Sequence, residues 1–280
     1  MFDLLAEMFS YTFLVRAVIV GLLVSLCAAL LGVSLVLKRY SMIGDGLSHV
    51  GFGTLAVATA MNVTPLKLSI PVVVLAAFLL LRISENSKIK GDAAIALIST
   101  GSLAVGVVAI SRTTGMNTDV YNYLFGSILA MSHTDVQLSI ALSVVVLMLF
   151  VLFYNKIFAV TFDEAFARAT GVKAGLYNML IAFLTAITIV LGMRMMGALL
   201  ISSLIIFPAL TSMRLCKKFR SVTMCSVVVS LICYSIGVVG SYIYAIPTGA
   251  SVVIVNIAAF FLFWGLALTP LQRIDAGLGK

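Results

Sequence analysis

The sequence is poor in charged residues, cysteine and histidine. Charged side chains make up only 10% of its 280 residues, too few to cover the surface of a water-soluble domain of this size. The four cysteines show no CxxC spacing, so neither a zinc knuckle nor a disulfide framework is indicated, and we interpret them as packing residues. A GxxxxGK[ST] phosphate loop and an HExxH motif are also absent, which argues against an ATP site and a zinc metalloprotease site in this chain.

Apolar residues dominate the rest of the sequence. They account for 62% of it, and the mean hydropathy is +1.20. These values indicate an all-α, polytopic integral membrane protein. The longest stretch of soluble composition, around residues 156–174, is too short for a separate catalytic or nucleotide-binding domain, so residues 1–280 are expected to form a single transmembrane domain. The formal net charge of +8 is interpreted as a signal of membrane topology and not of nucleic-acid binding.

The apolar runs predict a helical bundle with about nine transmembrane helices, because about 20 apolar residues are needed to cross the hydrocarbon core. Eight spans remain an alternative for two reasons. The third run is short and contains Pro65 and Pro71, and only Arg194 and Met195 separate the sixth run from the seventh. The predicted spans are residues 12–37, 42–60, 66–81, 93–110, 136–154, 176–193, 196–213, 221–243 and 249–268.

The basic residues predict the orientation of the bundle. When the N-terminus is placed outside the cell, every lysine and arginine except Arg16, Lys67, Arg112 and Arg194 falls on the cytoplasmic side. Lysine and arginine are enriched in cytoplasmic segments of membrane proteins. The sequence therefore predicts an outside N-terminus and a cytoplasmic C-terminus.

Asp45 and His49 are ionisable residues inside the second predicted span. Such residues are costly in a bilayer and often mark an ion or substrate pathway. Residues four apart share one helical face, and a carboxylate oxygen with an imidazole nitrogen suits zinc or manganese. Two ligands hold an ion weakly, as a conduit requires, and two copies of the chain about a two-fold axis would supply four.

A structural role for the same residues is an alternative. Asp45, between two glycines, could cap the start of a helix, with His49 hydrogen-bonded nearby. The second histidine, His133, is expected to be a solvated loop residue outside the membrane.

The segment TFDEAFARATG, residues 161–171, predicts a short cytoplasmic helix between the fifth and sixth spans. Thr161 and Glu164 fit a capping box, and Gly171 fits a C-terminal stop. A groove on a partner protein could cover the apolar face of this helix, or the helix could lie on lipid headgroups. The residues expected on that face are Phe162, Ala165, Phe166 and Ala169.

Three segments spread over the chain carry a family resemblance: RYSMIGDGLSHVGFG (39–53), FDEAFARATGV (162–172) and GALLISSLIIFPALTS (197–212). Together they resemble the permease subunits of bacterial ABC importers for zinc and manganese, the ABC-3 family. The first segment matches the family's aspartate and histidine at Asp45 and His49. The second resembles the family's coupling helix, which docks on the ATPase, and its matching residues are Phe162, Asp163, Glu164, Ala165, Ala167 and Gly171.

The resemblance implies a permease that imports divalent transition metal ions by alternating access, with zinc expected and manganese or iron as alternatives. It implies a multi-pass protein of the bacterial inner membrane that pairs with a second permease copy, a cytoplasmic ABC ATPase dimer and an extracytoplasmic metal-binding protein. ATP would be bound by the ATPase, so this chain would not be an enzyme. It would bind no cofactor beyond the metal in transit, which Asp45 and His49 would contact.

Other function classes compete with this one. In a proton-coupled secondary metal transporter, Asp45 and His49 would relay protons, although no inverted repeat is visible. An intramembrane metalloprotease lacks its HExxH motif, and two histidines are too few for most such sites. An assembly or scaffold subunit is the remaining alternative.

Overall fold

The helices of the protein follow the apolar runs of the sequence closely. The computed structural model describes residues 10–86, 91–112 and 133–268, and every regular element within these ranges is a helix. The helices are α2 (Thr12–Leu37), α3 (Ser41–Ala60), α4 (Pro65–Asn86), α5 (Gly91–Ser111), α7 (His133–Leu152), α8 (Tyr154–Phe162), α9 (Glu164–Ala169), α10 (Ala174–Met196), α11 (Ala198–Leu215), α12 (Phe219–Tyr244) and α13 (Thr248–Leu268).

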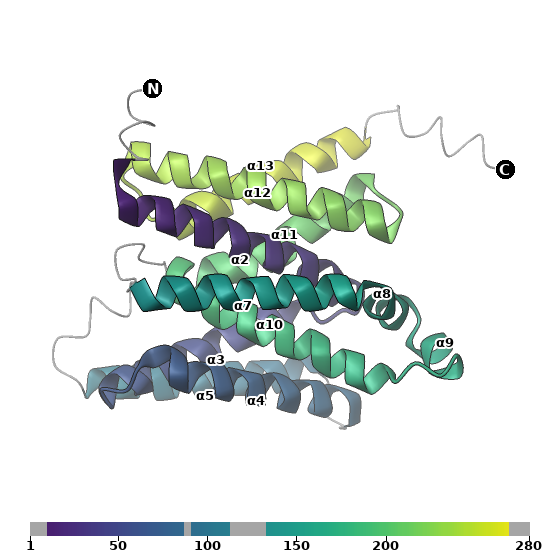
Figure 1. The fold of residues 1–280 in the computed structure, drawn as a ribbon, viewed down its shortest axis with the longest axis horizontal. Coiled ribbons are helices and arrows are strands. Elements are labelled where there is room, and N and C mark those ends of the chain that lie inside the picture. Colours follow the sequence, from purple (N-terminus) through teal and green to yellow (C-terminus); the bar gives the residue numbers. More distant parts are fainter. Residues whose placement is uncertain (1–9, 87–90, 113–132, 269–280) are drawn as a thin grey trace.

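All of the described helices except the short α8 and α9 run along the length of the bundle (Figure 1). Within the described ranges, 8 of them are long and apolar enough to cross a membrane. The remaining long helix, α3, has 20 residues but carries Asp45, His49 and several glycines and serines. The predicted all-α, multi-pass fold is therefore confirmed, while the number of crossings and the orientation stay predictions.

Only one residue separates α10 from α11. Gly197 lies between Met196, which ends α10, and Ala198, which begins α11. Its φ of 84° lies in the left-handed region that disfavours residues with a Cβ, so glycine permits this break in the helix. The sixth and seventh predicted spans are thus separate helices, and their junction lies beyond the predicted Arg194 and Met195.

Glycines bring several helices into close contact. A Cβ added at Gly53 of α3 would overlap the carbonyl oxygen of Ser102 in α5. A Cβ at Gly32 of α2 would overlap the carbonyl oxygen of Ile205 in α11. Small residues allow such approaches in a membrane, where lipid removes the usual hydrophobic drive for helix association. These contacts hold α3 against α5 and α2 against α11.

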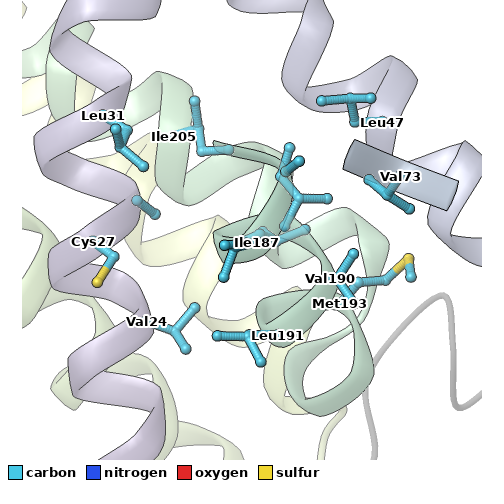
Figure 2. Packing of buried hydrophobic residues seen from close by; sticks show 14 of the residues in the cluster. Val24, Cys27, Leu31, Leu47, Val73, Ile187, Val190, Leu191, Met193 and Ile205 are labelled. Carbon is cyan, nitrogen blue, oxygen red and sulfur yellow. The ribbon is translucent and has the colours of Figure 1, made fainter. Parts of the chain in front are cut away.

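The centre of the bundle is formed by α2 and α10. About two thirds of the apolar window of α2 and 78% of that of α10 are buried, against 17% for both α5 and α13. Cys27 and Cys233 are buried, and all four cysteines are free, which fits their interpretation as packing residues. Figure 2 shows the core where α2, α3, α4, α10 and α11 meet, with Val24, Cys27, Leu31, Leu47, Val73, Ile187, Val190, Leu191, Met193 and Ile205.

Candidate functional site

The joint between α2 and α3 is short and places the candidate metal ligands near one end of the bundle. The backbone N–H groups of Arg39 and Tyr40 donate to carbonyl groups in the last turn of α2, at 3.0 and 2.8 Å. Arg39 has a φ of 61°, so this helix end has the form of a Schellman motif. With a rise of 1.5 Å per residue, Asp45 lies about 6 Å and His49 about 12 Å along α3 from its first residue.

Asp45 and His49 share one face of α3, as their spacing predicts. His49 Nε2 lies 3.7 Å from Asp45 Oδ2. In the isolated chain the His49 side chain is 26% exposed and the Asp45 side chain 44%. Met42, one turn earlier on the same side, is also exposed. The rest of the chain therefore leaves this surface, the Asp45–His49 face, partly uncovered.

The helix-cap alternative for Asp45 is wrong. The N-cap position of α3 is Tyr40, which makes no side-chain capping bond, and Asp45 lies inside the helix that starts at Ser41. His49 is not satisfied locally either, because its Nδ1 atom is buried and has no hydrogen-bond partner among the described residues. A buried polar atom without a partner is costly and calls for an explanation.

The geometry of the pair suits a shared cation. Their separation of 3.7 Å is too long for a good hydrogen bond. Two donors bound to one tetrahedral ion through bonds of about 2.1 Å lie about 3.4 Å apart, so a small side-chain rotation would accommodate an ion. The described part of the chain contains no group of three or more Asp, Glu, His or Cys residues placed to hold a metal. A complete ligand set would need water or donors from another chain.

Two serines connect this part of α3 to α11. Ser48 Oγ donates to the carbonyl of Asp45 at 2.7 Å, and Ser202 Oγ lies 3.4 Å from Ser48 Oγ. Ser202 lies in a stretch rich in small residues, which is typical of helix packing in a membrane. The sequence gives no signal that Ser202 lies beside the Asp45–His49 segment. Serines in membrane helices commonly donate to a carbonyl of their own helix, and Ser202 also donates to the carbonyl of Ala198 at 3.1 Å.

The second predicted site, residues 161–171, forms a helix capped differently from the prediction. Asp163 is the N-cap of α9, and its Oδ1 accepts a hydrogen bond from Phe166 N–H at 2.9 Å. The predicted capping box is wrong, because Thr161 belongs to α8 and its hydroxyl is buried without a partner among the described residues. Gly171 ends the segment as predicted, with a φ of 83°.

The surface of this segment is largely exposed. Phe162 and Phe166 are 71% and 65% exposed. Ala165 and Ala169 are also exposed, and no described part of this chain covers these residues. Of the predicted face, only Ala165, Phe166 and Ala169 lie on α9, because Phe162 is the last residue of α8. Ala167 instead points inward and packs with a small cluster around Val160 and Ala174.

Glu164 faces its own chain. Its carboxylate lies 3.3 Å from Lys38 Nζ at the end of α2, and it accepts hydrogen bonds from Asn178 Nδ2 of α10 at 3.1 Å and from Arg168 at 2.6 Å. Burial raises the pKa of the Glu164 carboxyl, but the hydrogen bonds from Asn178 and Arg168 and the charge of Lys38 outweigh it. The net pKa lies below the ordinary value, so Glu164 is a carboxylate at neutral pH.

A second, partly buried ion pair lies at the beginning of α7. Arg194 Nη2 at the end of α10 lies 3.0 Å from Asp135 Oδ2. His133, the first residue of α7, is exposed, as expected for a solvated residue, although it begins a helix and is not in a loop. The pair therefore links the start of α7 to the end of α10.

The chain is similar to known proteins over almost its whole length. Residues 10–266 match the family described as ABC 3 transport family. ZnuB, the membrane protein of a high-affinity zinc uptake system in Haemophilus influenzae, is 29% identical over 253 residues, which cover 90% of this chain and 97% of that protein. MntC, a manganese transport system membrane protein of Halalkalibacterium halodurans, is 27% identical over 256 residues, or 91% and 88% of the two chains. The solved structure of PsaBC from Streptococcus pneumoniae in complex with Fab has a TM-score of 0.85 and 27% identity, and the match covers 97% of both chains.

Proposed function

The chain belongs to the ABC-3 transport family, and from this premise we propose how its described residues move a metal ion. It is a membrane permease subunit of an ATP-driven importer of divalent transition metal ions, as its similarity to the zinc and manganese transport proteins indicates. Its helices form a multi-pass membrane protein. The proposals below concern the ion contact, the partners and the coupling of this importer.

Asp45 and His49 are the residues that contact the ion in transit. The observation that carries this role is their 3.7 Å separation on one partly exposed face of a helix inside an apolar bundle. A charged side chain at membrane depth is kept only where it meets a partner, a water-filled cavity or a cargo ion. Two donors bind an ion loosely enough to release it, as transport requires.

A second copy of the chain covers the Asp45–His49 face. The Asp45 carboxylate is partly exposed beside the exposed Met42, so both lie on the same uncovered surface. If this surface faced acyl chains, the charge of Asp45 would carry a large energetic cost. Two copies related by a two-fold axis would bring two Asp45 and two His49 side chains to one pathway. The ion would then have four donors, which is the number that zinc prefers.

The apolar face of α9 and its N-cap region docks on a cytoplasmic ATPase. Phe162 and Phe166 are exposed aromatic side chains outside the long helices, and such side chains are typical anchors of protein interfaces. The chain has no phosphate-binding loop of its own, so ATP binds to that separate subunit. ATP-driven closure of two ATPase subunits would move the docked segments and switch the permease between outward-open and inward-open states.

Zinc is the proposed cargo, delivered by an extracytoplasmic metal-binding protein. An imidazole nitrogen and a carboxylate oxygen are common zinc ligands, and tetrahedral coordination by two such pairs is a zinc geometry. Manganese accepts the same donors but favours more oxygen ligands. The ratio of zinc to manganese uptake therefore tests this assignment separately from the transport function.

The function is tested by reconstituting the permease with its ATPase subunit in liposomes that contain ATP. In the presence of the metal-binding protein outside, we expect zinc to accumulate only with ATP inside and only while ATP can be hydrolysed. Uptake without ATP that follows an imposed proton gradient would contradict this function and support a proton-coupled transporter. A scaffold subunit would be supported by two results together: no uptake with either ATP or a proton gradient, and no ATPase that copurifies with the permease.

A further inference from the structure

Glu164 is joined to α3 through Lys38. We propose that the polar cluster formed by Lys38, Glu164 and Asn178 transmits movement of the coupling segment to the Asp45–His49 face. This inference rests on the proposed function, in which α9 docks on the ATPase and α3 contacts the ion. It adds the residues that connect those two places, and it gives Glu164 a positioning role inside the permease instead of a docking role on the ATPase.

The cluster joins three helices by direct contacts. Lys38 lies at the end of α2, Glu164 is the first residue of α9 and Asn178 lies in α10. Lys38 Nζ donates to Glu164 Oε2 at 3.3 Å and also to Asn178 Oδ1, while Asn178 Nδ2 donates to the same Glu164 oxygen at 3.1 Å. Each member contacts the other two. A displacement of Glu164 therefore acts on Lys38 directly and through Asn178.

Burial makes the contact between Lys38 and Glu164 hard to break. The Lys38 side chain is only 8% exposed, and that of Glu164 is 33% exposed. A buried ammonium group that loses its opposite charge is strongly destabilised. When α9 moves, Lys38 is therefore expected to follow the Glu164 carboxylate.

The path from Lys38 to the Asp45–His49 face is short and stiff. Only Lys38, Arg39 and Tyr40 separate α2 from α3. Two backbone hydrogen bonds close the end of α2, and the N–H of Ile43 donates to the carbonyl of Tyr40 at 3.0 Å, which fixes the first turn of α3. Asp45 lies in the next turn, so a shift of Lys38 reaches the ion contact through one rigid helical turn.

The structure leaves room for such a shift beside the cluster. A cavity of about 20 Å³, the space of roughly one water molecule, lies next to the α2–α3 joint. It lies between residues of the joint, α4 and α10, so the joint can shift slightly into this space. The lining includes Lys38, Tyr40, Ile43, Ala77, Asn178 and Ile181.

Arg168 provides a matched control within the same segment. Its Nη2 lies 2.6 Å from Glu164 Oε1, closer than Lys38 does to this carboxylate. However, its side chain is 62% exposed and belongs to α9 itself, so it moves with Glu164 and does not lie on the path to α3. Removing it tests whether any loss of an ion pair at Glu164 has the same effect.

The experiment measures metal ions transported per ATP hydrolysed by the complete importer in liposomes. The variants are Lys38→Met, Glu164→Gln, the double variant of these two, and Arg168→Gln. We expect the ratio to fall about fivefold or more in both single variants and to stay within about twofold of the parent in Arg168→Gln. The double variant should be no worse than the worse single variant, because both residues act through one contact. Lys38→Arg keeps the charge and should retain the ratio.

An unchanged ratio in Glu164→Gln, or an equal fall in Arg168→Gln, overturns the transmission role. So does loss of ATPase copurification in Glu164→Gln, since Glu164 would then contribute to docking. Glu164→Gln decides the matter if Lys38→Met fails to fold, because the Glu164 side chain is a third exposed and a glutamine has nearly the same shape without the charge. Measurements on the parent importer separate the two proposals. ATP-independent uptake by the parent contradicts the proposed function. If the parent works and the variants keep its ratio of metal ions to ATP, only the transmission role is contradicted.

Discussion

Lys38 and Glu164 are 126 positions apart in the sequence, yet they form an ion pair of 3.3 Å between the end of α2 and the start of α9. This contact links the segment expected to meet the ATPase to the helix expected to meet the ion. In the proposed importer, ATP is hydrolysed by a separate subunit, so the energy must reach the membrane pathway through contacts of this kind.

Replacing Phe162 or Phe166 with alanine should weaken the association with the ATPase without destabilising the permease. Both side chains are more than half exposed in the isolated chain, so the free permease loses little packing. As interface anchors, each should contribute about 2 kcal/mol or more to binding, a loss of about thirtyfold or more in affinity. Titration of the purified ATPase onto the permease in detergent measures this change.

Phe13→Ala is the matched control for these variants. Phe13 is an exposed aromatic residue in the first turn of α2. Figure 1 shows that α2 begins at the opposite end of the bundle from α9. Its replacement should leave ATPase binding unchanged. Equal binding by all three variants and the parent would mean that the apolar face of α9 lies on lipid headgroups and not on the ATPase.

Gly53→Ala should destabilise the permease by about 1–3 kcal/mol, because its Cβ would overlap the Ser102 backbone and push α3 away from α5. Gly101→Ala is the control, since nothing lies within 4 Å of a Cβ at that position. Alanine is favoured over glycine inside a helix by about 0.5–1 kcal/mol, so this control should be neutral or slightly stabilising. Thermal unfolding in detergent compares the two, and equal midpoints would contradict the close packing of α3 on α5.

The Arg194–Asp135 pair should matter more for stability than the exposed Arg168–Glu164 pair. Both side chains of the first pair are less than a fifth exposed, so Arg194→Gln leaves a poorly solvated carboxylate and should cost about 1–3 kcal/mol. Arg168 is mostly exposed, and its loss should cost less than about 1 kcal/mol. The same unfolding measurement checks both, and Asp135→Asn in the Arg194→Gln background should restore part of the lost stability.

Hydrophobicity and residue spacing predict much of this fold and the geometry of one candidate site. Long apolar runs leave a helix as the only way to satisfy the backbone in lipid, so the helices were predictable to within a few residues. The shared face of Asp45 and His49 follows from the helical period alone. The stop at Gly171 was also predictable, because a positive φ at a helix end favours glycine.

Long-range contacts were not predictable from the same patterns. The partners of Glu164 come from two other helices, and no local rule indicates which distant residues meet. The capping box at Thr161 had the right residue types, but Asp163 is equally suited as a cap, and α8 extends through Phe162 and so takes up Thr161. Local sequence therefore predicted that a helix begins here, and tertiary packing decided where.

The most direct test of the account is metal uptake by Asp45→Asn and His49→Gln importers in ATP-loaded liposomes, with His133→Gln as the control. His133 is the chain's other histidine and is exposed at the start of α7. Because Asp45 and His49 are proposed to contact the ion, each replacement should lower zinc uptake by about tenfold or more, and the double variant should abolish it, while His133→Gln transports normally. Normal zinc uptake by the double variant would contradict the proposal that the ion passes along the Asp45–His49 face.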